Sequence, residues 1–345
     1  MNLVFDSTKI SPPSDINLPE YTEPIIYNNT SITTEKRNDS TYVFPKLTEK
    51  EIKANNKQKR KMAEQLIKFN KKQYSFIPLG SVLYNGKPKS IGEFYMQNHE
   101  VTNLEYRTFL FDLLTRNEKE AFLKAKPNQS LWINCTGNHF YDNFRNGYFS
   151  DKAFNDYPVV NISVEGAQMY CNWLSEIVNE LSKSKNDPLK ELKVQIPKEE
   201  DWVYSAKAGI KRGSYPWGSD SIQNSKNVFL ANFCAQKLKE QFRQPIVYPF
   251  KTNPMAFTSG GYALNNDTVS TVMVYAYNPN DYGLYCMSGN VSEWVISDDL
   301  KTVKALGGNW GSDFEHLRIN SESEFKERII ASPFIGFRPM IFLKK

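Results

Sequence analysis

The sequence predicts an α+β domain with little regular secondary structure, and three observations support that class. Downstream of Phe76, short runs with β-strand character alternate with Gly, Pro, Asn and Asp, which favour turns. In that region, three stretches place apolar residues at helical spacing: residues 102–110, residues 163–174, and a segment that begins at Pro197. The aromatic share of 14% indicates a core built on ring packing.

Three parts follow one another along the chain, and the third contains an insertion. Residues 1–47 are rich in Pro, Asn, Ser and Thr and predict an extended polar arm, since such a stretch buries too little apolar surface to offset its ordering entropy. Residues 48–73 predict an amphipathic basic helix, which starts at the capping box of Thr48 and Glu51. Residues 74–345 form the main domain. Within it, an aromatic-rich insertion covers about residues 111–156.

Each helix of the main domain has its own boundary signals. Thr102 precedes the first apolar-periodic stretch and Ser163 precedes the second, and both are residue types that cap helix N-termini. The third helix carries Trp202 and is expected to stop at Gly209, because glycine takes the left-handed conformation that ends many helices.

Composition excludes several classes of function. A net charge of +5 on 345 residues indicates solubility and no dedicated nucleic-acid surface. The basic residues of the 48–73 helix are more often a solvated face than a site for acidic lipid or nucleic acid. The four cysteines have no CxxC spacing and the three histidines are scattered, which argues against a zinc or non-haem iron site. Phosphate-loop, dinucleotide and nucleophile-elbow motifs are also missing from the sequence.

Seven ordered segments carry a family resemblance, and five of the six tryptophans lie inside them. The segments read FYM with HEVTNLEY (residues 94–106), YPVVNIS with YCNWL (157–174), IPKEEDWVYSAKAG (196–209), YPWG (215–218), YGLYCMSGNVSEW (282–294), GGNW (307–310) and GFR (336–338). Over roughly residues 76–343 the chain resembles the formylglycine-generating-enzyme, or sulfatase-modifying-factor, superfamily. The resemblance implies a C-type-lectin-like α+β fold.

The resemblance also implies an oxidase that holds copper between two thiolates and converts a substrate cysteine to formylglycine. The family places these cysteines four and nine residues after the second glycine of its GGSW segment. In this chain those positions are Ser312 and Leu317. A hydroxyl is a poor ligand for a soft metal and a leucine offers no donor, so the catalytic pair is absent and we expect a pseudoenzyme with no catalytic residues.

A calcium site of the superfamily is partly retained in the sequence. The resemblance places the carboxylate of Glu293 and the backbone carbonyls of Gly289 and Val291 around the ion. Cys286 stands where the first oxygen ligand belongs, and a thiol suits a hard cation poorly. We therefore expect no cofactor, or at most weakly held calcium at this site.

The expected function is a non-catalytic scaffold or protein-binding component of the bacterial cell envelope. Residues 148–160, YFSDKAFNDYPVV, resemble the gliding-motility and type IX secretion lipoproteins of Bacteroidetes-type bacteria. That resemblance implies a protein partner in an envelope complex, a location on the periplasmic face of the outer membrane, and a lipid anchor that this sequence does not include; no signal peptide is visible in it. Aromatic residues of the insertion are the expected partner surface: Trp132, Phe140, Tyr141, Phe144, Tyr148 and Phe149.

Two other functions stay open on the sequence alone. The first is a copper-dependent formylglycine-generating oxidase or a divergent oxidoreductase on the same fold. The second is a lectin-like module that binds glycan or peptide through surface aromatic residues and a surviving calcium ion.

Overall fold

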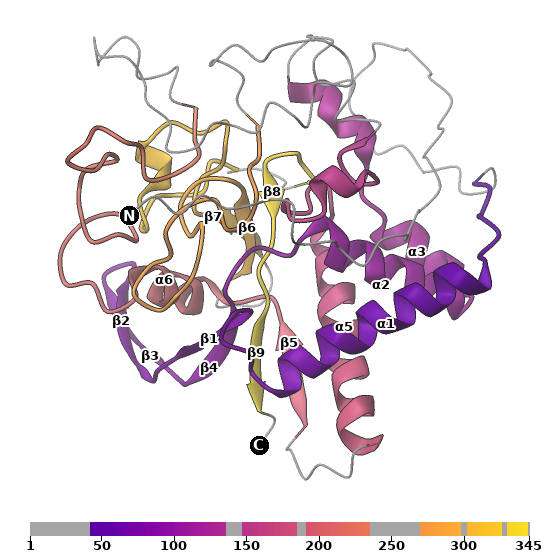
Figure 1. Cartoon of the computed structure of the whole chain (residues 1–345). Helices are drawn as coiled ribbons and strands as arrows, with labels where there is room; N and C mark the ends of the chain where they lie inside the picture. The colour runs from indigo at the N-terminus through magenta and orange to yellow at the C-terminus, as the bar shows by residue number, and fades with distance from the viewer. Residues whose placement is uncertain are drawn as a thin grey trace.

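A computed structural model describes residues 42–135, 147–184, 191–234, 270–297, 302–325 and 330–343 (Figure 1). The α+β class is confirmed, because short sheets and helices share one body. Most of the predicted arm, residues 1–41, lies outside the described residues. In the part of the chain that the structure describes, no helix combines the length and apolar character that a membrane span needs.

The central sheet has four antiparallel strands in the order β1-β4-β9-β5. They are β1 (Tyr74–Ile77), β4 (Phe94–Gln97), β9 (Met340–Leu343) and β5 (Leu192–Gln195). Because side chains alternate across a strand, Val194 and Ile341 pack with the helices on one face, whereas Met96 and Met340 pack with Trp202 on the other. The C-terminal strand thus lies between N-terminal and central segments and closes the domain.

Two smaller sheets flank the central one. The strands β2 (Gly80–Tyr84) and β3 (Lys87–Ile91) form a hairpin whose two-residue turn, Asn85-Gly86, has positive φ at both positions, as the tight hairpin turn requires. The third sheet has the order β7-β6-β8 and contains β7 (Val303–Leu306), β6 (Ser292–Ile296) and β8 (Ile335–Gly336). This sheet leads directly into the loop that would carry the family's catalytic cysteines.

Three helices begin where the sequence predicts, although the first one ends at Ile67 and not near residue 73. The helix expected from Pro197 begins at Glu199, and the short helix Lys119–Ala125 was not predicted. Thr48 and Thr102 each form a complete capping box with the glutamate three residues later. Ser163 accepts the Gly166 N–H at 3.1 Å. The third predicted helix ends as expected, with Ala208 and Gly209 both in the left-handed region. The helices are α1 (Glu49–Ile67), α2 (Asn103–Thr115), α3 (Lys119–Ala125), α5 (Val164–Ser184) and α6 (Glu199–Lys207), with short 3-10 turns at Gln129–Cys135, Lys152–Phe154 and Glu315–Leu317.

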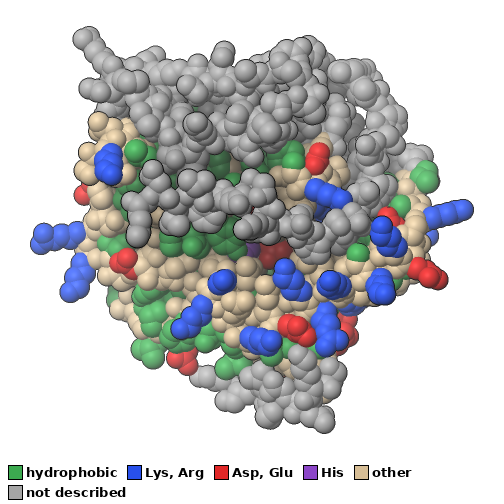
Figure 2. Space-filling view, in the orientation of Figure 1, with side chains coloured by type: hydrophobic (Ala, Val, Ile, Leu, Met, Phe, Trp, Pro, Cys, Tyr) green, Lys and Arg blue, Asp and Glu red, His purple; other side chains and the backbone are tan. Residues whose placement is uncertain are grey.

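Helix α1 packs into the core of the main domain. Met62, Ala63 and Leu66 are buried in the same cluster as the apolar residues of α2 and α5. Lys59 donates to the buried carboxylate of Asp112 at 2.6 Å, and that carboxylate also accepts Trp173 Nε1 at 2.8 Å. One carboxylate on α2 thereby joins three helices. The opposite face of α1 carries a row of lysines, which Figure 2 shows toward the viewer.

Tryptophans of the motif segments act as anchors in helices, in one strand and in loops. Trp173, Trp202, Trp294 and Trp310 are buried, and Trp217 is partly exposed. Four of these five indoles donate to a protein oxygen: Trp173 to Asp112, Trp202 to Glu293, Trp217 to the Ser221 carbonyl and Trp310 to the Pro333 carbonyl. These large rigid rings, four of which have a hydrogen-bonded indole N–H, therefore anchor the packing between the elements.

Candidate functional site

The loop after β7 holds the two positions where the family would have its copper ligands. Gly307 and Gly308 have φ values of +98° and +67°, so the chain turns sharply as it leaves the strand. Trp310 then fixes the loop to the domain: its backbone N–H donates to the Asn290 carbonyl at 2.9 Å and its indole donates to the Pro333 carbonyl at 3.0 Å. The loop is therefore held rigidly from both sides.

Ser312 is fully buried in a hydrogen-bond network of its own. Its hydroxyl donates to the carboxylate of Glu324 and accepts the Asn309 backbone N–H at 2.8 Å. The Asn309 side chain donates to the same carboxylate at 3.0 Å. The hydroxyl of Ser312 therefore holds the loop in place through hydrogen bonds to buried polar groups. A hydroxyl in this role is not a ligand for a soft metal.

Leu317 lies at the second position that the family resemblance assigns to a copper ligand, and it is part of a hydrophobic cluster. Its side chain is fully buried and lies among Tyr215, Phe229 and Phe233, with Phe314 and Trp217 packed around them. Burial of a leucine contributes about 1.5–3 kcal/mol to folding. A charged thiolate at this position would lose its solvation, so both the side chain and its surroundings are unsuited to copper.

The three cysteines whose side chains the structure describes do not supply the thiolate pair that the family resemblance implies. Cys171 lies in the α5 core and Cys286 is buried, and burial raises the pKa of both thiols well above the ordinary value. Cys234 does reach the loop, because its backbone N–H donates to the Ser312 carbonyl at 2.9 Å. No motif in the sequence indicates that Cys234 approaches this loop. One thiol is not a two-thiolate site, and the residues present do not fit a copper ion.

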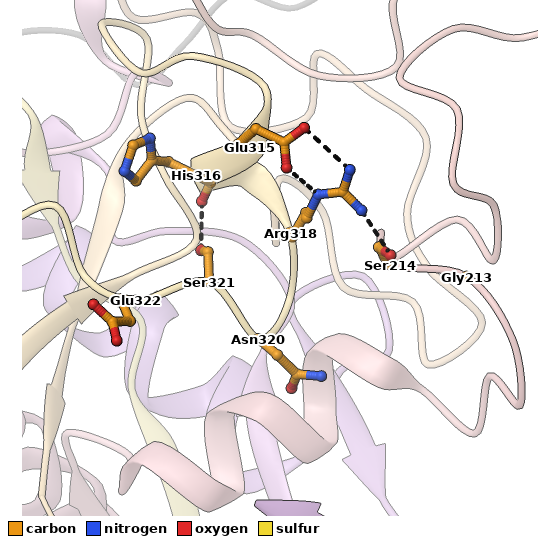
Figure 3. A pocket seen from close by; sticks show the side chains of 8 residues that line it. All are labelled: Gly213, Ser214, Glu315, His316, Arg318, Asn320, Ser321 and Glu322. Atoms are coloured by element: carbon orange, nitrogen blue, oxygen red, sulfur yellow. Dashed lines mark hydrogen bonds and ion pairs between the residues drawn. The ribbon is translucent and has the colours of Figure 1, made fainter. Parts of the chain in front are cut away.

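A polar hollow of about 420 Å³ opens beside the same loop (Figure 3). Arg318 spans its wall, since its guanidinium donates to Glu315 at 2.6 and 3.1 Å and to the Ser214 hydroxyl at 3.0 Å. His316 points away from that pair and contacts Asp313 at 2.8 Å. The lining residues are Gly213, Ser214, Glu315, His316, Arg318, Asn320, Ser321 and Glu322. This lining suits the binding of a polar ligand and contains no pair of soft metal ligands.

A larger hollow of about 950 Å³ lies between the β2–β3 hairpin, the start of α6 and β7. Glu199, almost fully buried, accepts hydrogen bonds there from the Tyr84 hydroxyl and from Lys304 Nζ at 3.0 Å. The remaining wall includes Val203, Leu306 and other apolar side chains. Sequence reasoning missed both hollows, because each one joins segments that are distant along the chain.

The expected calcium ligand Glu293 is committed to another partner. Its two carboxylate oxygens accept hydrogen bonds from Arg338 at 2.6–3.1 Å, and Oε2 also accepts Trp202 Nε1 at 2.8 Å. Gly289 has φ +78°, and a Cβ there would lie 2.4 Å from the Asn232 carbonyl oxygen, so that backbone is packed closely against its neighbour. Val291 is buried as well. A guanidinium already neutralises the carboxylate that calcium would need, and the arrangement does not fit the ion.

A second buried carboxylate, Glu100, lies beside this ion pair. Its Oε1 accepts Asn290 Nδ2 at 2.9 Å, and its Oε2 has no hydrogen-bond partner among the described residues. The pKa of Glu100 is raised to about 8, chiefly by burial and also by the nearby charge of Glu293, while Arg338 and the Asn290 hydrogen bond oppose the rise. One guanidinium thus faces two carboxylates. In the sequence Glu100 is only one residue of a motif, and nothing there predicts that its carboxylate is buried beside the Glu293–Arg338 ion pair.

Three of the six aromatic residues expected at a partner surface are buried, and that expectation was wrong for them. Trp132, Tyr148 and Phe149 are at most 2% exposed. Trp132 stacks on Trp310 with ring centroids 6.3 Å apart, and the Tyr148 hydroxyl donates to the Pro158 carbonyl at 2.6 Å. These rings attach the insertion to the domain. Phe140, Tyr141 and Phe144 lie outside the described residues, so their role stays a prediction.

Comparison with known proteins agrees with this architecture. Residues 59–341 match the family model "Sulfatase-modifying factor enzyme 1-like domain". The chain is 25% identical over 235 residues to the inactive C-alpha-formylglycine-generating enzyme 2 of Bos taurus, covering 61% of this chain and 63% of that protein. It is 23% identical over 230 residues to the formylglycine-generating enzyme of Mus musculus, covering 60% and 49%.

Among solved structures, the crystal structure of CarF aligns with a TM-score of 0.45 and 18% identity, over 79% of this chain and 98% of that one. The alignments span 63% of the bovine relative's length and 49% of the mouse relative's length. The match to the family model begins inside α1, which packs in the same core as the rest of the domain. On the extent of that match, the chain belongs to the sulfatase-modifying factor enzyme 1-like (formylglycine-generating-enzyme-like) family.

Proposed function

We propose that this chain is a non-catalytic member of its family, a scaffold or protein-binding component of a bacterial cell envelope. One observation carries the non-catalytic part: the two catalytic positions are occupied by a buried serine that clamps a loop and by a leucine inside a hydrophobic cluster. An inactive relative is among the similar proteins, and so are active enzymes. The family fold therefore supports either state, and the residues at these positions decide between them.

The same proposal assigns the loop a structural role without a metal ion. Ser312 satisfies Glu324 and Asn309, while Arg338 supplies the positive charge beside Glu293. Both places where the family resemblance implies a cation are held by the chain's own hydrogen bonds. Neither copper nor calcium is then required for folding.

The envelope role rests on the resemblance of residues 148–160 to gliding-motility and type IX secretion lipoproteins. In this proposal a lipid anchor holds the protein at the periplasmic face of the outer membrane, where it assembles with a protein partner. Within the insertion, Phe140, Tyr141 and Phe144 remain the proposed contact residues. Aromatic side chains of this kind are enriched at the centres of protein interfaces.

Affinity capture from envelope extracts tests the partner proposal. We expect the full chain to recover one protein in fixed stoichiometry, and we expect the triple variant F140A/Y141A/F144A to recover it at least tenfold less well. A matched control is M273A/I330A/L343A, which removes three exposed apolar side chains elsewhere. A strictly monomeric protein that captures no specific partner would contradict the proposal, as would equal loss in the control.

A further inference from the structure

The positive charge of this chain is concentrated on one helix and its two ends. Between Lys46 and Lys72 there are ten basic and three acidic residues, an excess larger than the net charge of +5 of the whole chain. The remainder of the protein is therefore slightly acidic. The solvent side of α1 carries an acidic residue, Glu64, among these basic residues. Such a large positive excess indicates attraction to an anionic partner.

The charges lie on the solvent face of α1, opposite the buried residues Met62 and Leu66. At 3.6 residues per turn, positions 50, 57, 61 and 68 fall within about 40° of one another, in a line about 27 Å long. The basic stripe consists of these lysines together with one neighbour on the same side, and all five are exposed: Lys50, Lys53, Lys57, Lys61 and Lys68. Figure 2 shows lysine and arginine side chains in this row along α1.

Two other basic residues of α1 form ion pairs within the domain. Lys59, which faces the domain, pairs with Asp112, and Arg60 pairs with Glu64 at 3.1 Å. Both of those residues lie outside the stripe as defined. Ten basic residues in this stretch include a single arginine. Protein interfaces are enriched in arginine and depleted in lysine, whereas clusters of lysine suit the diffuse negative charge of a lipid surface.

An exposed apolar region continues from the C-terminal end of the stripe. Phe69, directly after Lys68, stacks on Tyr95 with centroids 3.9 Å apart, and Tyr95 contacts Phe76 edge-to-face at 5.3 Å. Phe76 is 49% exposed and is followed by Leu79 and Leu83 at 71% and 62%. Basic residues that flank exposed apolar side chains form the pattern by which proteins lie on a membrane surface.

From this arrangement we propose that the basic stripe and Phe76 form a surface that docks on an anionic lipid bilayer. The lysines attract the headgroups, and the aromatic ring enters the boundary with the acyl chains. The inference deepens the proposed envelope role and rests on it for the compartment. Its direct consequence is that one face of the domain lies flat on the membrane, so that the side of the molecule away from α1 is left for a partner.

Vesicle co-sedimentation of the full chain tests the proposal. We expect binding to phosphatidylcholine vesicles that contain one-third phosphatidylglycerol, and little binding to pure phosphatidylcholine. Raising the salt should release the protein, because the Debye length falls from about 10 Å at 0.1 M to about 3 Å at 1 M. Inorganic phosphate at equal ionic strength should compete no better than chloride, which separates a bilayer from a free-phosphate site.

The variant K50Q/K57Q/K61Q/K68Q should lose at least tenfold in vesicle affinity, since each lysine near an anionic surface contributes about fivefold. Glutamine keeps the helix propensity of lysine, so the fold should persist. The matched control K87Q/K183Q/K211Q/K226Q removes four exposed lysines outside the stripe and should retain affinity within about twofold. F76S should weaken binding most at high salt, where apolar contact is the remaining attraction.

Three results would overturn the proposal: no preference for anionic vesicles, equal loss in both quadruple variants, or tight binding of duplex DNA by a protein that ignores vesicles. Capture of the envelope partner is measured separately. A protein that captures its partner but ignores vesicles refutes only the membrane surface, and the reverse result refutes only the partner proposal.

Discussion

Replacing Arg338 by methionine is expected to destabilise the folded domain by about 3–5 kcal/mol, the cost of leaving a buried carboxylate without its counter-charge. Arg338 is fully buried and donates to Glu293 at 2.6–3.1 Å, as well as to the backbone carbonyls of Gln97 and Tyr285. These contacts connect the C-terminal GFR segment to β4 and to β6. Urea unfolding followed by tryptophan fluorescence measures the change.

A double variant separates charge from packing in this experiment. R338M/E293Q removes both charges, so it should be more stable than R338M by at least about 1 kcal/mol. R338K should remain destabilised, because a lysine cannot reproduce the bidentate fork. If R338M alone unfolds at nearly the same urea concentration as the parent, the ion pair is not what holds these segments together.

The second large effect is a loss of stability as the pH rises, which originates at Glu100. Its folded pKa of about 8 lies above the ordinary value of 4.5. Between those values the folded protein retains a proton that the unfolded chain has released, so the free energy of unfolding falls with rising pH. The contribution is fully present below the unfolded pKa and is lost as the pH rises through the folded one.

Glu100→Gln should remove this dependence, because the amide mimics the protonated carboxyl in size and keeps an oxygen for Asn290. Comparing pH 5 with pH 9, we expect the variant to gain at least about 1 kcal/mol over the parent. Burial lowers the pKa of His99, so this residue makes the free energy of unfolding rise with pH on the acid side. His99 is present in both proteins, so its contribution cancels in the comparison. The exposed Glu120→Gln is the control. Parallel stability curves for parent and E100Q would refute the assignment.

The sequence predicted those features that depend on local chemistry. The capping box at Thr48, the N-cap at Thr102 and the left-handed end of α6 follow from side chains within a few residues of one another. The absence of the catalytic pair stays a prediction from the family resemblance, which places the two cysteines at the positions of Ser312 and Leu317. The residues that surround these two positions could not be predicted from the sequence. The cluster around Leu317 draws on residues from Tyr215 onward, and Cys234 approaches Ser312 through a backbone contact.

The aromatic insertion is a second case in which the sequence does not predict the contacts of its residues. An aromatic-rich segment between motifs has the same composition whether it covers the domain or contacts a partner. Trp132, Tyr148 and Phe149 pack inward because Trp310 and the Pro158 carbonyl offer them a stacking surface and an acceptor. Likewise, the sequence predicts α1 as a part separate from the main domain. Its contact with Asp112 could not be predicted, because the two residues lie 53 positions apart along the chain.

An oxidase assay tests the central claim, that this member of the family is non-catalytic. The full chain is incubated with Cu(I), oxygen and a cysteine-bearing peptide, and aldehyde formation is followed by mass spectrometry, with the mouse formylglycine-generating enzyme as the positive control. The loop positions hold Ser312 and Leu317 in place of a thiolate pair. We therefore expect no peptide aldehyde above the copper-only background and no stoichiometric Cu(I) binding. Turnover of the peptide by the unmodified chain would contradict the account.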